Sequence, residues 1–79
     1  MSENTKRLLS TLLVLGAQSP ERALSSKDLA DKLGIDVLSV EAELKRLVEA
    51  GYAQAVAHEG VTKIYLTGTG VITASSTYS

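Results

Sequence analysis

The first apolar pattern in the chain is a wide leucine face near the N-terminus. Leucines repeat there at i, i+4 and i+7, which predicts a helix over residues 5–17. Gly16 and then Pro20 are placed to end this helix. At about 100° per residue, these leucines together cover roughly 160° of the helix circumference. Such a face belongs to a helix packed deeply at the centre of the domain, or to a helix whose Leu9 and Leu13 contact a second subunit. The five leucines are Leu8, Leu9, Leu12, Leu13 and Leu15.

Two further helices are predicted, over about residues 26–33 and 37–50. Gly34 is placed to end the first of them, and Asp36 is placed to cap the second. Only residues 34–36 connect the two helices, and so short a turn forces a steep crossing between them. The buried face of the later helix has apolar residues at helical spacing, which are Val37, Val40, Leu44, Leu47 and Val48.

After these helices the apolar period changes from helical to alternating, which predicts strands over residues 52–57 and 61–67. Residues 58–60 separate the strands, and Gly60 supplies the positive φ that a tight hairpin needs. The connector before the second helix can add a very short strand at residues 23–24.

The last segment, residues 68–79, is rich in Gly, Ser and Thr. Thr67 is placed to cap one or two helical turns. The apolar residues of these turns are Val71, Ile72 and Ala74. We expect an ordered core over about residues 5–74 and a flexible C-terminal tail over residues 75–79. Residues 1–79 are too few for two hydrophobic cores, so the chain is expected to form a single domain.

Composition and charge exclude several classes of protein. Apolar residues make up 44% of the chain and charged residues 22%, which is typical of a globular domain and not of a disordered chain. The absence of cysteine excludes disulfides, thiolate metal sites and thiol nucleophiles. Eight basic residues against nine acidic ones exclude a polybasic tail for nucleic acid or membranes. The longest apolar run has four residues, against the ~20 that span a bilayer, so we expect a soluble, cytoplasmic protein without membrane contact.

Candidate catalytic and metal-binding groups are few. His58 is the single histidine, and no serine and aspartate are arranged with it as a triad. It has no evident partner ligands for a metal and suits an exposed hairpin turn. The Gly68-Thr69-Gly70 segment lacks the following lysine of a phosphate-binding loop. We therefore expect a protein that is not an enzyme and that needs no metal or cofactor.

Three blocks of sequence carry a resemblance to a known family. They are Leu29-Ala30-Asp31-Lys32-Leu33-Gly34-Ile35, then Val40, Leu44 and Leu47 followed by Gly51-Tyr52, and finally Tyr65-Leu66-Thr67. In this order and spacing they resemble the winged helix-turn-helix family, notably its MarR-like and PadR-like branches, over about residues 8–72. The resemblance implies an α+β fold with a three-helix core and a C-terminal β-hairpin that forms the wing.

The resemblance also implies a transcriptional regulator that binds double-stranded DNA, with the third helix in the major groove and the wing near the backbone. The outward face of that helix is compatible with DNA, because Leu38 and Ala42 can touch thymine methyls and Arg46 can reach a guanine edge. Ser39 can donate to a base or a phosphate, and Lys45 flanks this face. The residues expected to bind DNA are Lys27, Leu38, Ser39, Ala42, Lys45, Arg46, His58 and Lys63.

The charge balance of the same region leaves a second interpretation open. Residues 26–51 contain four basic and six acidic residues, and Glu59 lies at the hairpin tip. Phosphate neutralisation drives nonspecific binding, so we expect weak binding per monomer, aided by a homodimer with Leu9 and Leu13 at its interface. The alternative is a winged-helix module that binds a protein partner without binding DNA, in which the basic residues of the third helix belong to a solvated face.

Overall fold

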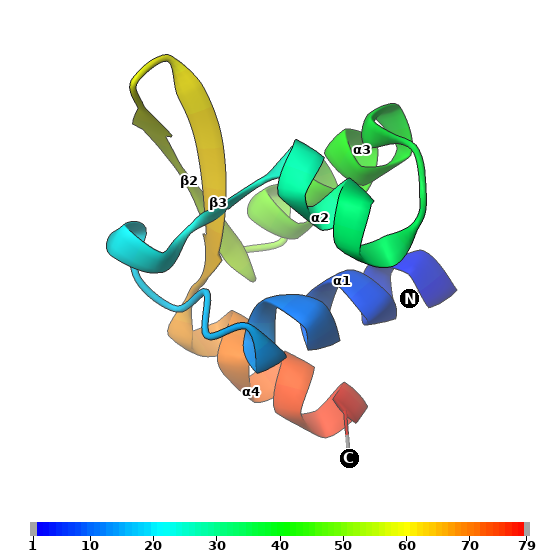
Figure 1. Cartoon of the computed structure of the whole chain (residues 1–79). Helices are drawn as coiled ribbons and strands as arrows, with labels where there is room; N and C mark the ends of the chain where they lie inside the picture. Colours follow the sequence, from blue (N-terminus) through cyan, green and yellow to red (C-terminus); the bar gives the residue numbers. More distant parts are fainter. Residues whose placement is uncertain (1, 79) are drawn as a thin grey trace.

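The structure is a computed structural model that describes residues 2–78, and it contains four α-helices, a short 3₁₀ turn and one three-stranded sheet (Figure 1). The elements in chain order are α1 (Glu3–Val14), η1 (Pro20–Arg22), β1 (Leu24–Ser25), α2 (Ser26–Leu33), α3 (Val37–Glu49), β2 (Ala53–His58), β3 (Val61–Leu66) and α4 (Gly68–Tyr78). The α+β class expected from the sequence is confirmed, and the arrangement is compatible with a winged-helix-like fold.

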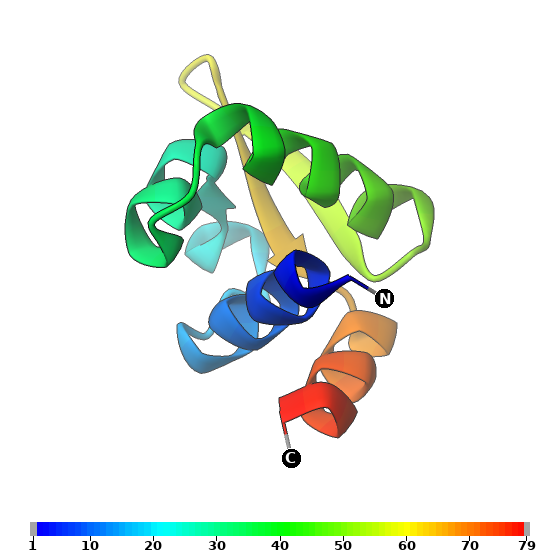
Figure 2. The same cartoon turned by 90° about the vertical axis from the view of Figure 1, so that its right-hand side faces the viewer.

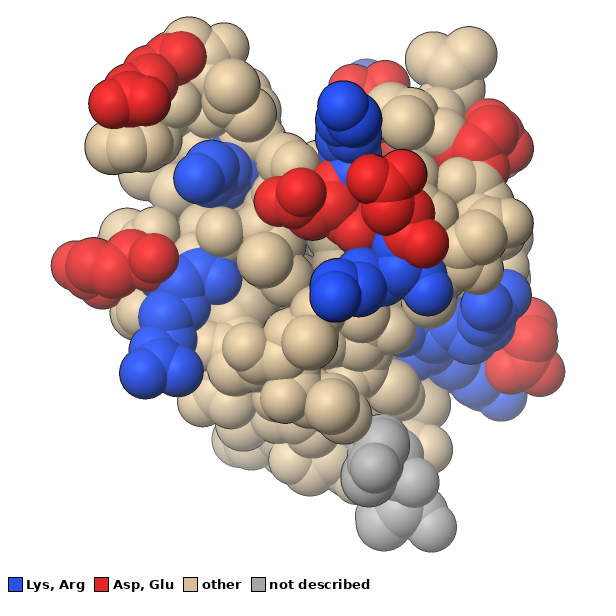
Figure 3. Space-filling view, viewed as in Figure 1, with Lys and Arg blue, Asp and Glu red and all other residues tan. Residues whose placement is uncertain are grey.

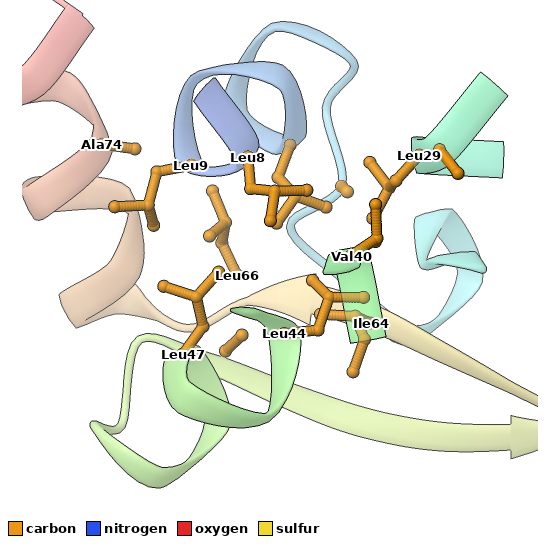
Figure 4. Close-up of a cluster of buried hydrophobic side chains, with 13 residues drawn as sticks. Leu8, Leu9, Leu29, Val40, Leu44, Leu47, Ile64, Leu66 and Ala74 are labelled. Carbon is orange, nitrogen blue, oxygen red and sulfur yellow. The ribbon is translucent and has the colours of Figure 1, made fainter. Parts of the chain in front are cut away.

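The other elements pack around α1. α2 and α3 lie on one side of it, α4 packs across the other side, and the tip of the β2–β3 hairpin projects away from both α1 and α4 (Figures 1 and 2). Side chains from all four helices and from the sheet meet in one buried cluster (Figure 4). Each fully buried leucine in such a cluster contributes about 2 kcal/mol to stability. The large members of the cluster are Leu8, Leu9, Leu12, Leu29, Val40, Leu44, Leu47, Ile64 and Leu66.

The helix boundaries follow capping residues that are visible in the sequence. The hydroxyl of Ser25 accepts a hydrogen bond of 3.1 Å from a backbone N–H in the first turn of α2. Gly34 ends α2 in the left-handed conformation, at φ 69°, as predicted. α1 ends at Val14 and not at residue 17, because Gly16 turns the chain at φ 74° before the helix can reach that point.

The hairpin predicted from the alternating pattern is confirmed. β3 lies between β1 and β2 with antiparallel pairing throughout, and all six residues of β2 pair with all six of β3. Glu59 and Gly60 form a two-residue turn with φ of 51° and 78°, a double left-handed geometry that matches the twist of the flanking strands. The short strand β1 lies at Leu24–Ser25, one residue later than predicted.

The C-terminal segment contradicts the expected flexible tail over residues 75–79. α4 continues through residues 75–78, and the last residue of that tail lies outside the described residues. The Thr67 hydroxyl accepts a hydrogen bond of 3.1 Å from the backbone of Gly70, so the predicted cap is confirmed, but the helix has 11 residues and not one or two turns. Its inner side is buried against the domain, and this packing stabilises a helix that its own residues favour only weakly. No helix among the described residues is long and apolar enough to cross a membrane.

Leu9 cannot form the dimer contact that was predicted for it. Its side chain is fully buried inside the chain and lies beside Ala74 of α4 (Figure 4). Leu13 is half-buried and packs against the same cluster. The wide leucine face therefore belongs to a deeply packed central helix, because α4 covers the part of it that the sequence left available for a second subunit.

Replacing Gly70 with alanine is expected to destabilise the protein. α4 passes so close to the segment between α3 and β2 that a methyl group at Gly70 would overlap the carbonyl oxygen of Tyr52. That carbonyl is already fixed by a hydrogen bond of 3.1 Å from the backbone N–H of Thr67. The overlap should lower the free energy of unfolding by about 2–3 kcal/mol, measured by urea denaturation.

The matched control is Gly68→Ala, two residues earlier in the chain and on the open side of α4. Nothing lies within 4 Å of the position that its methyl group would take. Its free energy of unfolding should stay within about 0.5 kcal/mol of the wild-type value. Equal stability of the two variants would contradict the close approach of α4 to Tyr52.

Candidate nucleic-acid interface

The direction of α3 is set by the three-residue connection that precedes it. Gly34 ends α2, Asp36 caps α3, and only Ile35 remains between them, half-buried against the core. The apolar stripe of α3 is thereby turned toward the interior, and its opposite side is left facing solvent (Figure 2). The buried residues of this stripe are Val40, Leu44 and Leu47.

The outward side of α3 brings together five of the eight residues expected to bind DNA. Leu38 is 77% exposed, Ala42 is exposed one turn later, and Ser39 is half-buried beside them. Lys45 and Arg46 are exposed in the second half of the helix. This side of the helix is therefore uncovered and carries apolar, hydroxyl and basic groups together.

Ser39 is engaged by the N-cap of α3. Its hydroxyl donates to Oδ1 of Asp36 at 2.7 Å, and its backbone N–H donates to Oδ2 at 2.9 Å. These hydrogen bonds, the one from the hydroxyl foremost, lower the pKa of Asp36 below its ordinary value of 3.8. Because its proton points at Asp36, the Ser39 hydroxyl presents lone pairs to a ligand, and not the hydrogen-bond donor expected from the sequence.

Glu43 positions Arg46, a role that the sequence pattern did not reveal. One oxygen of Glu43 accepts a hydrogen bond of 2.5 Å from the Thr5 hydroxyl, which ties α1 to α3. The other oxygen lies 3.7 Å from Nη1 of Arg46, whose side chain is 73% exposed. An ion pair this exposed contributes about 0–1 kcal/mol, so a phosphate or a guanine edge could displace it.

The hairpin residues expected to bind DNA point away from α3. Strand alternation places Lys63 and His58 on the side of the hairpin that faces η1, where they line a shallow hollow with Glu21. His58 Nε2 lies 3.8 Å from Oε1 of Glu59 in the exposed turn. Lys27 is exposed in the first turn of α2. The structure therefore does not bring Lys63 and His58 together with the outward side of α3.

An apolar groove of about 400 Å³ lies between α3 and the hairpin. Its floor includes Val48 of α3 and Ile64 of β3, while Glu41, Lys45 and Glu49 follow one another by one helical turn along its rim. On the hairpin side the groove is lined by Ala55 of β2 and by Thr62 and Ile64 of β3, and the small side chain of Ala55 leaves it open. A small residue at this position of a strand is the sequence signal from which the groove could have been predicted.

Charge is mixed around the hairpin and α2. On the face drawn in Figure 3, basic and acidic side chains alternate over these elements, and they do not form a continuous basic stripe. Two carboxylates, Glu41 and Glu49, also border the groove beside α3. The electrostatic attraction for phosphate is consequently local, and is strongest at the neighbouring residues Lys45 and Arg46.

Comparison with known proteins adds no relative from which a role could be transferred. No protein-family model, no curated protein and no solved structure matches this chain. Within residues 2–78, no group of three or more His, Asp or Glu side chains could hold a metal ion.

The cap of α3 is expected to make stability depend on pH in the acid range. The pKa of Asp36 is lower in the folded protein than in the unfolded chain, because only the folded state provides the Ser39 hydrogen bonds. This stabilisation is complete above the ordinary pKa of 3.8 and is lost as the pH falls through the folded value. Asp36→Asn should therefore lower the melting temperature by a few degrees at neutral pH, and the difference from wild type should vanish in strong acid.

A second variant distinguishes the hydrogen bond from the Ser39 hydroxyl from the one donated by the Ser39 backbone N–H. Ser39→Ala removes the hydrogen bond that lowers the pKa of Asp36 most, so Asp36→Asn should have a smaller effect when it is made in that background. Thermal unfolding followed by circular dichroism across the acid range measures both differences. A difference between wild type and Asp36→Asn that does not change with pH would contradict this account of the cap.

Proposed function

We propose that this protein is a small transcriptional regulator of the winged helix-turn-helix type, which binds duplex DNA as a homodimer. The observation that carries the proposal is the uncovered side of α3, which displays Leu38, Ala42 and Arg46. A three-residue connection from α2 precedes this helix and sets its direction. A helix held rigidly by its opposite face and exposed along its length is the form in which proteins read the major groove.

The dimensions of α3 support this role. Its 13 residues span about 20 Å, and a single α-helix fits the major groove, which is about 12 Å wide. Leu38 and Ala42 lie in its first half, the part of a recognition helix that meets base edges, and can contact thymine methyl groups. Arg46 follows one turn later and can bind a guanine edge or a phosphate.

A homodimer would compensate for the small number of basic groups. Two recognition helices need a separation of about 34–36 Å to enter successive major grooves on one side of the duplex. The longest dimension of the domain, 34 Å, is comparable with this separation. Doubling the number of phosphate contacts also steepens the dependence of affinity on salt concentration.

A second candidate function is docking of a protein through the groove between α3 and the hairpin. Its apolar floor and the carboxylates of Glu41 and Glu49 favour a partner segment that is both apolar and basic. The two functions make opposite predictions for these carboxylates. Glu41→Gln with Glu49→Gln should strengthen DNA binding by removing repulsion from phosphates, whereas it should weaken the binding of a basic protein segment.

DNA binding is tested by fluorescence anisotropy with a mixed-sequence duplex at low salt. Arg46→Ala is expected to weaken binding about 5–10-fold, because it removes a charged hydrogen-bond donor from the contact face. Lys6→Ala removes one positive charge from an exposed position of α1, away from α3, and should change the affinity for the duplex less than twofold. If the folded protein at about 10 μM leaves the anisotropy of the duplex unchanged, the proposal is wrong, because that concentration is within the range of nonspecific DNA affinities.

A further inference from the structure

The sheet has two edges, and only one of them is protected against pairing with another chain. β1, at one edge, has only two residues and leads directly into α2. β2, at the other edge, has six residues that pair with β3 in one continuous register. Its sequence, AQAVAH, contains no proline, lysine, arginine or carboxylate. Proteins usually protect an edge strand by making it very short, by bulges or by such residues, so β2 is an unprotected edge.

The pairing of the hairpin determines which backbone groups of β2 face away from β3. In an antiparallel pair, residues that exchange hydrogen bonds with the partner strand alternate with residues whose N–H and C=O point away from it. The N–H of Thr67 donates to the carbonyl of Tyr52 at 3.1 Å, which places the bonded residues of this strand at the even-numbered positions. The N–H and C=O groups of Ala55 and Ala57 therefore point out along the open edge. Both alanines are exposed, and no turn or loop within residues 2–78 bonds to their backbone.

The groove beside α3 lies along the same strand. α3 crosses the face of the hairpin (Figure 2), and Ala55 lines the groove between them, together with Val48 of α3 and Ile64 of β3. In an added strand, the residue directly opposite Ala55 would place its side chain on the same face of the sheet as the Ala55 methyl group. That side chain would point toward the groove, where the small size of Ala55 leaves room for it.

We propose that β2 binds an extended segment of a partner protein, which joins the sheet as a fourth strand. Another extended backbone presents N–H and C=O groups at the spacing needed to pair with Ala55 and Ala57, which a nucleic acid does not. The hydrogen bonds between backbones supply the affinity, and the alternate side chains that enter the groove supply the specificity.

The charge around the groove defines the chemistry of this segment. Glu41, Lys45 and Glu49 form the rim along α3, so the rim is net negative, and β2 itself contributes no lysine or arginine to balance it. The segment therefore has an apolar side chain opposite Ala55 and a lysine or arginine two residues away, on the same face of the sheet and beside these carboxylates.

A second copy of β2 fits this edge less well than such a segment. Pairing of two β2 strands around a two-fold axis would place two acidic rims on the same side of one continuous sheet, and neither strand provides a lysine or arginine to meet them. The charge complementarity of the site is therefore with a different chain.

This site goes beyond the proposed function, because it uses the edge of the sheet and not the outward side of α3. It shares the groove with the docking candidate described above. A helical segment could occupy that groove without pairing with β2, so the experiment has to distinguish strand pairing from binding in the groove alone.

The probe is a fluorescein-labelled peptide of eight residues in which valine alternates with threonine and one valine is replaced by lysine. Its fluorescence anisotropy should report binding to the protein with a dissociation constant of about 10–100 μM. A peptide with glutamate in place of the lysine should bind at least about fivefold more weakly, because it meets the carboxylates of Glu41 and Glu49.

Amide hydrogen exchange followed by NMR tests the pairing itself. In the free protein, the amides of Ala55 and Ala57 should exchange rapidly, whereas that of Val56, which pairs with Lys63, should exchange slowly. An excess of unlabelled peptide should slow the exchange of Ala55 and Ala57 at least about tenfold, because their N–H groups then donate to the added strand.

A proline variant removes one of the edge donors. Ala57→Pro eliminates an N–H that β3 does not use, so the hairpin should form with an unchanged circular dichroism spectrum. The variant should bind the peptide at least about tenfold more weakly. Ala57→Ser, the matched control, retains the N–H and a small side chain and should bind within about twofold of wild type.

The exchange measurement on wild-type protein keeps the test decisive if Ala57→Pro fails to fold. Unchanged anisotropy of the peptide at about 500 μM protein would overturn the inference. Binding that leaves the exchange of Ala55 and Ala57 unchanged would overturn strand pairing and leave docking in the groove. Slow exchange of these amides without peptide, increasing with protein concentration, would place a second copy on the edge and overturn the assignment of the partner. Failure of DNA binding would remove the proposed function and leave this inference standing.

Discussion

Burial of the leucine face of α1 is the interaction on which the rest of the structure depends. Leu8, Leu9 and Leu12 are fully buried, and α1 contacts α2, α3, β3 and α4. At about 2 kcal/mol for each leucine, this one helix contributes a substantial part of the stability of a chain this short. Because every other helix packs against it, α1 also fixes which of their sides remain exposed.

The exposed side of α3 is a consequence of this arrangement. Val40, Leu44 and Leu47 must face the core, and the three-residue connection from α2 leaves the helix little freedom to do otherwise. Glu43 reinforces the orientation through its hydrogen bond to Thr5 of α1. The same packing that stabilises the domain therefore also exposes the residues proposed to read DNA, and no additional structural element is required to present them.

Charged residues are distributed unevenly along the chain. Charged residues are confined to the middle of the sequence, which forms η1, β1, α2, α3 and most of the hairpin, together with the first turns of α1. The second half of α1 and all of α4 contain no charged residue. In the function proposed above, the outward side of α3, within this charged part of the sequence, meets the polyanion. The acidic rim of the groove beside α3 would then limit nonspecific affinity, so that base contacts contribute more to target choice.

Local signals in the sequence were enough to predict the three central helices, the hairpin and the outward side of α3. Caps at Asp36 and Gly34, the alternation after α3 and the glycine in the turn each act within a few residues of the structure that they determine. The sequence did not reveal the extent of α4, the burial of Leu9, the side of the hairpin on which Lys63 lies, or the groove between α3 and β2. Each of these depends on contacts between segments far apart in the chain. α4 is stable because α1 covers its inner side, and Leu9 is buried because α4 covers it, so neither outcome can be read from the periodicity of one segment alone.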